Sequence, residues 1–585
     1  MQLVHLESID DPQVEAYTNL TELQLRNRLE PSKGIFIAES PKVITRALAA
    51  GRQPISLLVE EPWIEGMADI FAFIDEHWGD DIPVYVASPE QLRRITGYRL
   101  HRGALAAMHR WELPTVAEVC ANATRIAVLE KESDVCTQTS RRNTGMLHAG
   151  FLYKTSSLKA ICAVEGNQEF DQVARELDVP FKRTGKLIVS FTDEHRQRLE
   201  QFMVRGEANG VKGLELLARK RMDELDPSDG DNFTMWCQAS GILDPFLYTI
   251  ALAENAVHNG AEYHLNCAFT GETRQADGTH LLHTTRGDFH TRWVVNSAGL
   301  NSAVVSGQLG IPGYVIKPVK GEYFVLDKLA GQFAKIPVYP APNPDNTFDT
   351  HATPTVDGNV LVGPDSQLAR DFQDYESTQA AMDGLIESGS RMFKHMDRAY
   401  FIRNFAGIRP KRIDPATGAV QDFVLECRDE APGVVNLVGI ESPGVTSALP
   451  LARRAVALIA RQEALEPNPD FDPIRHGIRR FADMTDEERA AAIAENPDYG
   501  EIFCRCEKVT KAEILQAIHN PLGVHTVNGI KVRTRATMGR CQGGYCETRI
   551  TEALHRELGE DFRDIHLGPE GSWMFTGSVK GGEPA

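Results

Sequence analysis

The stretch RIAVLEKE at residues 125–132 decides how the middle of the chain folds. Its apolar run is typical of a buried strand, and the strand ends in the acid Glu130. Two later runs have the same character, WVVNSAGLNS at 293–302 and VVNLVGIESPGVTSALPLA at 434–452. Each passes from an apolar strand into small residues and then toward a helix. The region from Thr124 to Glu463 is therefore expected to be α/β.

Small residues at the ends of these strands indicate a ligand or a tight turn. Ala298 and Gly299 let the backbone approach a flat or phosphate-bearing ligand where a larger side chain would clash. Gly439 and Gly444 stand at a strand-to-helix turn, where N–H groups can point at an anion or at a carbonyl group of a ligand. An ordinary turn explains either motif taken alone.

Six ordered motifs extend this pattern. Besides the two runs above, they are TSRRNTGMLHAGFLYKTSSLKA (139–160), GEYFVLD (321–327), HATPTVDGNVLVGP (351–364) and FAGIRPKR (405–412). Together they resemble the FAD-dependent oxidoreductases of the D-amino-acid oxidase superfamily, in the branch of anaerobic glycerol-3-phosphate dehydrogenase and L-2-hydroxyglutarate dehydrogenase. The resemblance implies a Rossmann-like domain at 124–463, with an antiparallel substrate sheet mainly in 180–355. It also implies FAD contacts from Glu130, Ser140, Asn143, Ala298, Gly299, Gly439, Gly444 and Val445.

Three residues are candidates for catalysis. His148 lies in MLHAG, beside the flavin ring by resemblance, and an imidazole there can take a hydroxyl proton or contact the flavin. His351 is a second candidate for the substrate pocket. Arg409 precedes Pro410, and its fork suits a carboxylate or a phosphate. A surface ion pair for Arg409 and a structural role for either histidine are the alternatives.

One family motif is missing. Members of this superfamily begin with a strand and a GxGxxG turn that admits the pyrophosphate to a helix N-terminus. The sequence contains no GxGxxG. We therefore expect an incomplete FAD-binding domain without its first βα unit, and a weakened affinity for FAD.

Residues 1–112 form a different unit. Apolar runs alternate with helical patterns, which predicts a small α/β domain with a mostly parallel sheet. The segments 11–51 and 83–110 resemble the substrate-binding module of SpoU-type RNA 2'-O-ribose methyltransferases, without the knotted catalytic domain. Residues 93–110 are locally basic, which predicts weak, salt-dependent RNA contact. A solvated helix and loop is the alternative.

Four cysteines cluster near the C-terminus as Cys504-x-Cys506 and Cys541-x4-Cys546. Two close pairs of thiolates can hold a 2Fe–2S cluster or a zinc ion. The segments 502–518 and 534–550 resemble the bacterioferritin-associated ferredoxin-like module. N–H groups of Gly539, Gly543 and Gly544 are expected to bond cluster sulfurs, which favours 2Fe–2S, in an electron-transfer or a purely structural role.

Composition sets the remaining expectations. The 585 residues, 42% hydrophobic with net charge −19, indicate a multidomain protein of α/β and α+β character without a generally basic surface. No membrane span or leader is evident, so a cytoplasmic protein is expected. The expected segments are linkers at 113–123 and 464–498, a small helical 2Fe–2S domain at 499–550, and a helix and tail at 551–585.

The functional hypothesis is an FAD-dependent dehydrogenase of a small 2-hydroxy acid or glycerol 3-phosphate. Electrons would leave through the 2Fe–2S cluster to an unidentified acceptor. The alternative is a non-catalytic RNA-binding fusion with a relic flavin domain.

Overall fold

The computed structural model describes residues 2–6, 8, 11–18, 34–96, 104–109, 126–217, 233–342 and 350–577. The chain divides into two compact units, Met1–Leu113 and Pro114–Ala585. Within the described residues, every helix is too short or too polar to cross a bilayer.

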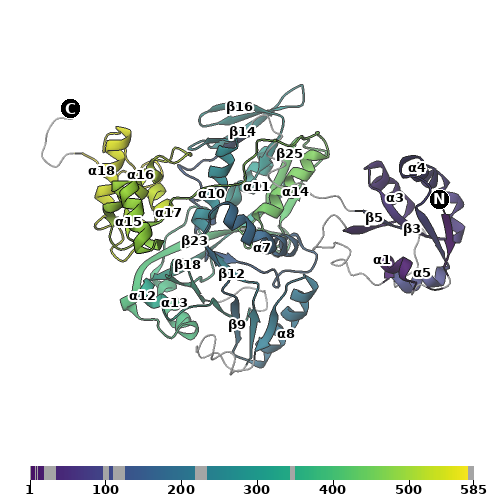
Figure 1. Ribbon diagram of the computed structural model, residues 1–585, viewed down its shortest axis with the longest axis horizontal. Helices are drawn as coiled ribbons and strands as arrows, with labels where there is room; N and C mark the ends of the chain where they lie inside the picture. Colours follow the sequence, from purple (N-terminus) through teal and green to yellow (C-terminus); the bar gives the residue numbers. More distant parts are fainter. Residues whose placement is uncertain are drawn as a thin grey trace. The chain divides into compact units, whose positions relative to one another are not determined.

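The first unit is a twisted five-stranded sheet with helices on both faces (Figure 1, purple). Its strand order is β1-β4-β3-β5-β2, with bounds Gln2–His5, Pro83–Ala87, Pro54–Glu60, Ala104–His109 and Ile35–Glu39. The strands β1, β4 and β3 are parallel, and β5 runs antiparallel to both β3 and β2. The expected mostly parallel sheet is present, with β5 as the one reversed strand among those described.

Successive side chains of β3 point to opposite faces of the sheet, which explains why this unit has two hydrophobic cores. Leu57 packs against α3 (Pro41–Ala49) and α4 (Ala68–Trp78), whereas its neighbour Leu58 packs on the opposite face. That second face carries α1 (Glu15–Thr18) and α5 (Pro89–Thr96). Of the basic segment, Arg93 and Arg94 are exposed at the end of α5. Arg99, His101, Arg102 and Arg110 of this segment lie outside the described residues.

The second unit is built on a large sheet of order β10-β11-β9-β19-β20-β21-β18-β22, with β23 paired to β18. The bounds are Leu214–Leu217, Phe233–Cys237, Lys186–Ser190, Val338–Pro340, His351–Pro354, Val360–Gly363, Val315–Leu326 and Gln367–Leu368, with β23 at Phe401–Ile413. Its pairings are antiparallel except for β9 with β19. Helices α8 (Asp193–Ala208), α12 (Lys328–Gly331) and α13 (Gln379–Met392) flank it.

The Rossmann-like part consists of small sheets built on parallel pairs, one of which carries β24 (Val424–Glu426) as an antiparallel edge strand. The strand β6 (Ala127–Leu129) pairs with β13 (Glu262–His264), and β17 (Val294–Asn296) pairs with β25 (Val434–Val438), which also holds β24. Around them lie α7 (Leu158–Glu176), α10 (Pro245–His258), α11 (Ser302–Gln308) and α14 (Ala448–Ala460). Short strands β7 (Met146–Leu147), β12 (Gly241–Leu243) and β8 (Phe181–Lys182) pair beside α7.

One strand prediction is wrong. The run 280–295 is expected in the substrate sheet, but β15 (His280–Thr284) and β16 (Gly287–Thr291) form their own three-stranded sheet with β14 (Phe269–Arg274). Leu282 and Phe289 pack with Leu309 and Val434, on the nucleotide-domain side. Alternating strands look alike in either sheet, so the sequence pattern does not distinguish them.

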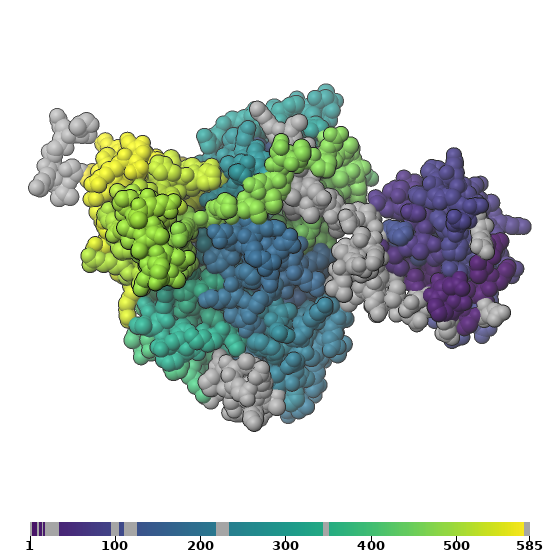
Figure 2. Space-filling view, viewed as in Figure 1, coloured from purple at the N-terminus to yellow at the C-terminus, as the bar shows by residue number. Residues whose placement is uncertain are grey.

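The C-terminal part is a small helical module (Figure 1, yellow). It contains α15 (Asp486–Glu495), β26 (Ile502–Cys504), β27 (Val509–Thr510), α16 (Lys511–Ile518), α17 (Val527–Thr534) and α18 (Glu547–Leu558). Its core joins these last three helices through Ile514, Ile530 and Leu554, and extends to Ile565 near the C-terminus. In the space-filling view this module and the blue-green part of the same unit share a continuous contact (Figure 2).

Candidate functional site

The turn Thr139–Asn143 is fixed on the middle of β23. Thr139 Oγ1 donates to the Ile408 carbonyl at 2.8 Å, and the Arg142 guanidinium donates to the Ala406 carbonyl at 3.3 Å. Gly407 makes this approach possible, because a Cβ there would stand 2.0 Å from the Arg142 oxygen. The turn therefore approaches β23 most closely at Gly407, two residues before Arg409.

Asn143 and Ser140 shape this turn. The Asn143 amide donates to the Ser140 carbonyl at 2.6 Å, and its oxygen accepts from the Gly145 N–H at 2.8 Å. The Asn143 side chain thus stabilises the backbone of the turn, and its ligand contacts would come from the main chain.

His148 lies beside the turn that follows β25. The backbone N–H of His148 donates to Thr446 Oγ1 at 3.1 Å, and the ring Nε2 is 3.2 Å from Ser442 Oγ. Burial, together with the charge of Lys186, lowers the pKa of His148 to about 3. The imidazole is therefore neutral near pH 7.

His351 and Lys186 both pack on the Tyr339 ring. The His351 ring stacks on Tyr339 with centroids 3.6 Å apart, and Lys186 Nζ stands 3.4 Å from the Tyr339 ring centre. Burial, then the charges of Lys186 and Arg409, lowers the pKa of His351 well below its usual value. Lys186 is 1% exposed, and burial lowers its pKa to about 7. Two neutral imidazoles thus lie near two cationic side chains.

Arg409 is on β23, opposite Val319 of β18. Its Nη2 donates to the Asp365 carbonyl at 3.4 Å and would be 3.4 Å from a Cβ at Gly321. Burial raises the pKa of Tyr323 to about 12, against the opposing effect of Arg409. The absence of a side chain at Gly321 leaves room for the guanidinium over the sheet.

Close contacts and hydrogen bonds restrict the backbone conformation of the turn Gly439–Val445. Gly439 has φ +71°, and a Cβ there would stand 2.5 Å from Arg412 Cβ. The expected availability of the Gly444 N–H is wrong, because this group donates to the Glu441 carbonyl. Glu441 in turn pairs with Lys159 at 2.7 Å, and Val445 is half-buried.

The turn after β17 is open on one side. Gly299 has φ +57°, and a Cβ there would meet nothing within 4 Å. Ala298 is exposed, and so is Val295 of β17 at 46%. A strand in the middle of a complete sheet would be covered, so this edge is uncovered by the described chain.

Glu130 ends the other piece of the sheet. Its Oε1 accepts from the Glu132 N–H at 3.0 Å, and burial raises its pKa. Among the described residues, β6 pairs with β13 alone and β17 with β25 alone. The split agrees with an incomplete Rossmann-like sheet.

The residues described above fit two of the three parts of FAD, the ribose and the flavin, but not the pyrophosphate. Glu130 suits the ribose, and the Thr144–His148 and Gly439–Val445 segments suit the flavin. Ser302 and Ser447, beside the two glycine turns, have buried hydroxyls that lack a hydrogen-bond partner in the described chain. These are the groups that would hold a polar cofactor, whereas the sequence offers no GxGxxG for the pyrophosphate.

The four C-terminal cysteines meet as two pairs. The Cys504 thiol contacts that of Cys546, and the Cys506 thiol contacts that of Cys541. The Cys546 contact, with N–H groups of Glu507 and Thr537, lowers the pKa of Cys504 to about 6. In the described residues no three His, Cys, Asp or Glu converge as on one metal ion. Two thiolates for each of two irons match a 2Fe–2S cluster.

One glycine of this loop acts differently from the prediction, and for Gly539 and Gly543 the expected N–H bonds to cluster sulfurs stay a prediction. The Gly544 N–H donates to the Cys541 carbonyl at 3.1 Å, so it stabilises the loop. Gly539 instead leaves room for Cys506, whose Cβ would be 2.3 Å from a Cβ at that position.

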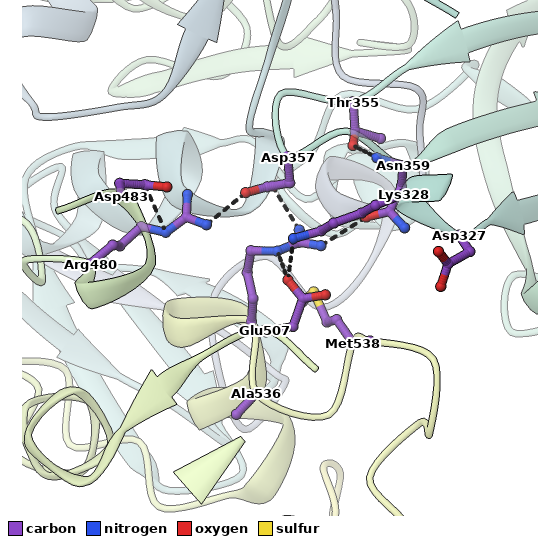
Figure 3. A network of polar contacts seen from close by, with 12 residues as sticks. Asp327, Lys328, Thr355, Asp357, Asn359, Arg480, Asp483, Glu507, Ala536 and Met538 are labelled. Carbon is purple, nitrogen blue, oxygen red and sulfur yellow. Dashed lines mark hydrogen bonds and ion pairs between the residues drawn. The ribbon is translucent and has the colours of Figure 1, made fainter. Parts of the chain in front are cut away.

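Buried ion pairs attach the cluster module to the flavin part of the same unit. Arg533 of α17 forms a two-fold pair with Asp134, at 2.7 and 3.1 Å. Arg535 binds Asp357 at 2.7 Å and Glu507 at 2.9 Å. Arg480 pairs with the same Asp357 at 2.8 Å (Figure 3). Although burial opposes it, Arg535 and Arg480 lower the pKa of Asp357.

Sequence reasoning missed Lys186, Tyr339 and these arginines. For Lys186 there was a signal, because KLIVS places one cation in an apolar strand, and lysines are rarely buried without a reason. For Arg533 and Arg535 no local pattern exists, since their partners are distant in the sequence.

Comparisons with known proteins agree with this site. A family model described as FAD dependent oxidoreductase matches residues 111–458, and one described as BFD-like [2Fe-2S] binding domain matches 502–556. Glycerol 3-phosphate dehydrogenase of Caloramator mitchellensis is 35% identical over 458 residues, 78% of this chain and 94% of that protein. L-2-hydroxyglutarate dehydrogenase of Caenorhabditis elegans is 27% identical, over 56% of this chain and 86% of that protein.

Among solved structures, the L-alpha-glycerophosphate oxidase of Mycoplasma pneumoniae with FAD bound superposes with a TM-score of 0.57 at 25% identity. The match covers 62% of this chain and 94% of that one. The chain therefore belongs to the FAD dependent oxidoreductase family, as an FAD-dependent dehydrogenase homologue that carries a BFD-like 2Fe–2S domain.

Proposed function

We propose that the chain oxidises the CH–OH group of a small anion, glycerol 3-phosphate or a 2-hydroxy acid, and passes the electrons through the 2Fe–2S cluster. The observation that carries the proposal is the position of His148 beside the Gly439–Val445 turn, with its Nε2 3.2 Å from Ser442 Oγ, and the presence of Lys186 and Arg409 near enough to His351 to lower its pKa. Two cations select an anionic substrate, and a neutral imidazole can take the hydroxyl proton.

His148 is the proposed base. Its Nε2 would accept the hydroxyl proton, and Ser442 Oγ at 3.2 Å orients the ring. FAD, when bound, supplies the acceptor for the hydride that leaves the same carbon. His351, held on Tyr339 by stacking, would position the substrate from the sheet side.

Arg409 and Lys186 would hold the anionic end. The planar fork of Arg409 suits a carboxylate and a phosphate equally. Two substrate classes therefore stay within the proposal. The electron acceptor beyond the cluster is not identified.

Substrate-dependent reduction of the loaded chain tests the proposal. The chain, reconstituted with FAD, iron and sulfide, is mixed anaerobically with glycerol 3-phosphate or L-2-hydroxyglutarate, and the flavin absorbance is followed. Bleaching by one substrate, slowed about a hundredfold or more in His148→Gln, is expected for a general base. A chain that retains no flavin after reconstitution would instead favour the relic domain.

The N-terminal unit carries a separate proposal. Its resemblance to an RNA methyltransferase module, with exposed Arg93 and Arg94, supports weak RNA contact without methyl transfer. Salt-independent RNA binding, or methyl incorporation into RNA, would contradict it.

The thiolates needed for the cluster suit a reducing compartment, which supports a cytoplasmic location.

A further inference from the structure

A cavity of about 320 Å³ lies between the flavin-binding turn and the cluster module. One wall comes from Arg141–Gly145 and the start of α10, and the opposite wall comes from α17 and the loop that includes Met538 and Gln542. Neither the proposed substrate site nor the thiol cluster includes this space. Its volume is at the lower end of small-molecule pockets, which begin at about 300 Å³.

The cavity shares one face of the large sheet with the substrate pocket. Residues paired across β20, β21, β18 and β23 alternate between the two faces, so His351, Tyr323 and Arg409 are on the same face as Val325 and Arg403. The turn Thr139–Asn143 crosses this face above Ala406–Ile408. It therefore divides the face into two compartments, one for the substrate and one against the cluster module.

Cationic side chains line the second compartment from both walls. Arg141, Arg142 and Arg403 come from the flavin side, and Lys531 and Arg535 come from the module. Arg535 is already neutralised by Asp357 and Glu507. In the described parts of the chain, the side chains of Lys531 and Arg141 have no hydrogen bond or ion pair. Burial, with the charges of Arg403 and Arg141, lowers the pKa of Lys531 to about 7.

The rest of the lining is mixed. The carboxylates of Asp244 and Asp357 and several amide and hydroxyl side chains are polar, and the other side chains are apolar. Val325, Leu361 and Phe405 come from the sheet, Phe246 from α10, and Val532 and Met538 from the module. An anion with an apolar or planar body would satisfy both parts of the lining, and a bare inorganic anion would satisfy only the cations. Several cations around one point favour a dianion over a carboxylate.

We propose that this cavity binds a phosphate monoester with a planar apolar body, its phosphoryl group between Lys531 and Arg141 and its body on Phe405 and Leu361. The ligand would touch both the flavin-binding turn and the cluster module. Its binding would therefore stabilise the contact between the two parts.

Phenyl phosphate is the probe for this site. Calorimetric titration of the full chain, loaded with FAD and cluster, is expected to show one phenyl phosphate per chain, with weaker binding of inorganic phosphate and weaker still of phenol. Lys531→Gln is expected to lower the affinity about tenfold or more, because it removes a charge-assisted hydrogen bond. Lys531→Arg should retain binding, and Lys212→Gln, at an exposed lysine elsewhere, should leave it unchanged.

Three outcomes would overturn the proposal. Unchanged affinity in Lys531→Gln would place the probe elsewhere. Binding seen only before FAD is loaded would make the cavity part of the FAD site. A loss in Arg409→Lys equal to that in Lys531→Gln would place the probe in the substrate pocket. If Lys531→Gln loses the visible absorbance of the cluster, Arg141→Gln replaces it, since that residue lies outside the module.

Discussion

The cluster site and the flavin site are assembled in opposite ways. The four cluster cysteines lie within one short helical module with its own core. The residues proposed for FAD and substrate come from β6, the Thr139–His148 segment, β17, β20, β23 and the Gly439–Val445 turn. Among the described residues, β6 with β13 and β17 with β25 and β24 form separate sheets. A local site tolerates the loss of a distant segment, whereas a site assembled from many segments depends on each of them.

The cluster ligands give the largest expected effect. Replacing Cys541 with Ser removes one of two thiolates from one iron, so the full chain should lose its iron and acid-labile sulfide almost completely. FAD binding should be unchanged, because the flavin site contributes no cluster ligand. Cys427→Ser, at a half-buried cysteine far from the module in sequence, is the matched control. Equal iron in both variants, or stoichiometric zinc in place of iron and sulfide, would contradict the ligand assignment.

The ion pair between the two regions gives the next largest effect. Arg533→Met leaves Asp134 buried and without its cation, which should lower the free energy of unfolding by about 3–5 kcal/mol. Urea unfolding followed by cluster absorbance measures this. The double variant Arg533→Met with Asp134→Leu removes both charges and should recover most of the loss. If it recovers none, the pair is not what holds the module.

Backbone strain at the flavin turn gives a smaller effect. Gly439→Ala combines φ +71° with a Cβ contact of 2.5 Å, and should cost about 1–3 kcal/mol of stability. Gly418 has the same φ of +71° with nothing within 4 Å, so Gly418→Ala carries the strain without the clash. Thermal unfolding of both variants separates the cost of the backbone strain from the cost of the Cβ clash. Equal losses would show that the turn yields to the new methyl group.

The pH dependence of substrate binding gives the smallest effect. Because the pKa of Lys186 is lowered to about 7, its ammonium is present below that pH and is lost as the pH rises through it. The KM for an anionic substrate should therefore rise between about pH 7 and pH 9, by up to about tenfold. Lys186→Arg keeps its charge and should show a flat profile, whereas Lys186→Met should have the high KM throughout. A rise that persists in Lys186→Arg would assign the dependence to another group.

Much of this organisation was predictable from local pattern. The strands around Glu130, Ala298 and Gly439, and the cysteine spacing, follow from short runs of sequence, and the family matches agree with them. The contacts of the turns were not predictable. Whether the Gly444 N–H is available depends on the Glu441 carbonyl, and the placement of 280–291 depends on packing with Leu309. Lys186 meets His351 only through pairing across the sheet, which sequence spacing does not reveal.

The Arg535 network also bears on the speed of turnover. Many electron-transfer modules are attached by a flexible tether, and the rate then depends on how fast the module diffuses to its partner. Here Glu507, next to Cys506, is joined through Arg535 to Asp357 of the large sheet by buried ion pairs. These ion pairs restrain the cluster module against the large sheet. Transfer from flavin to cluster should be insensitive to solvent viscosity, and added glycerol or sucrose should slow only the steps in which substrate and final acceptor diffuse.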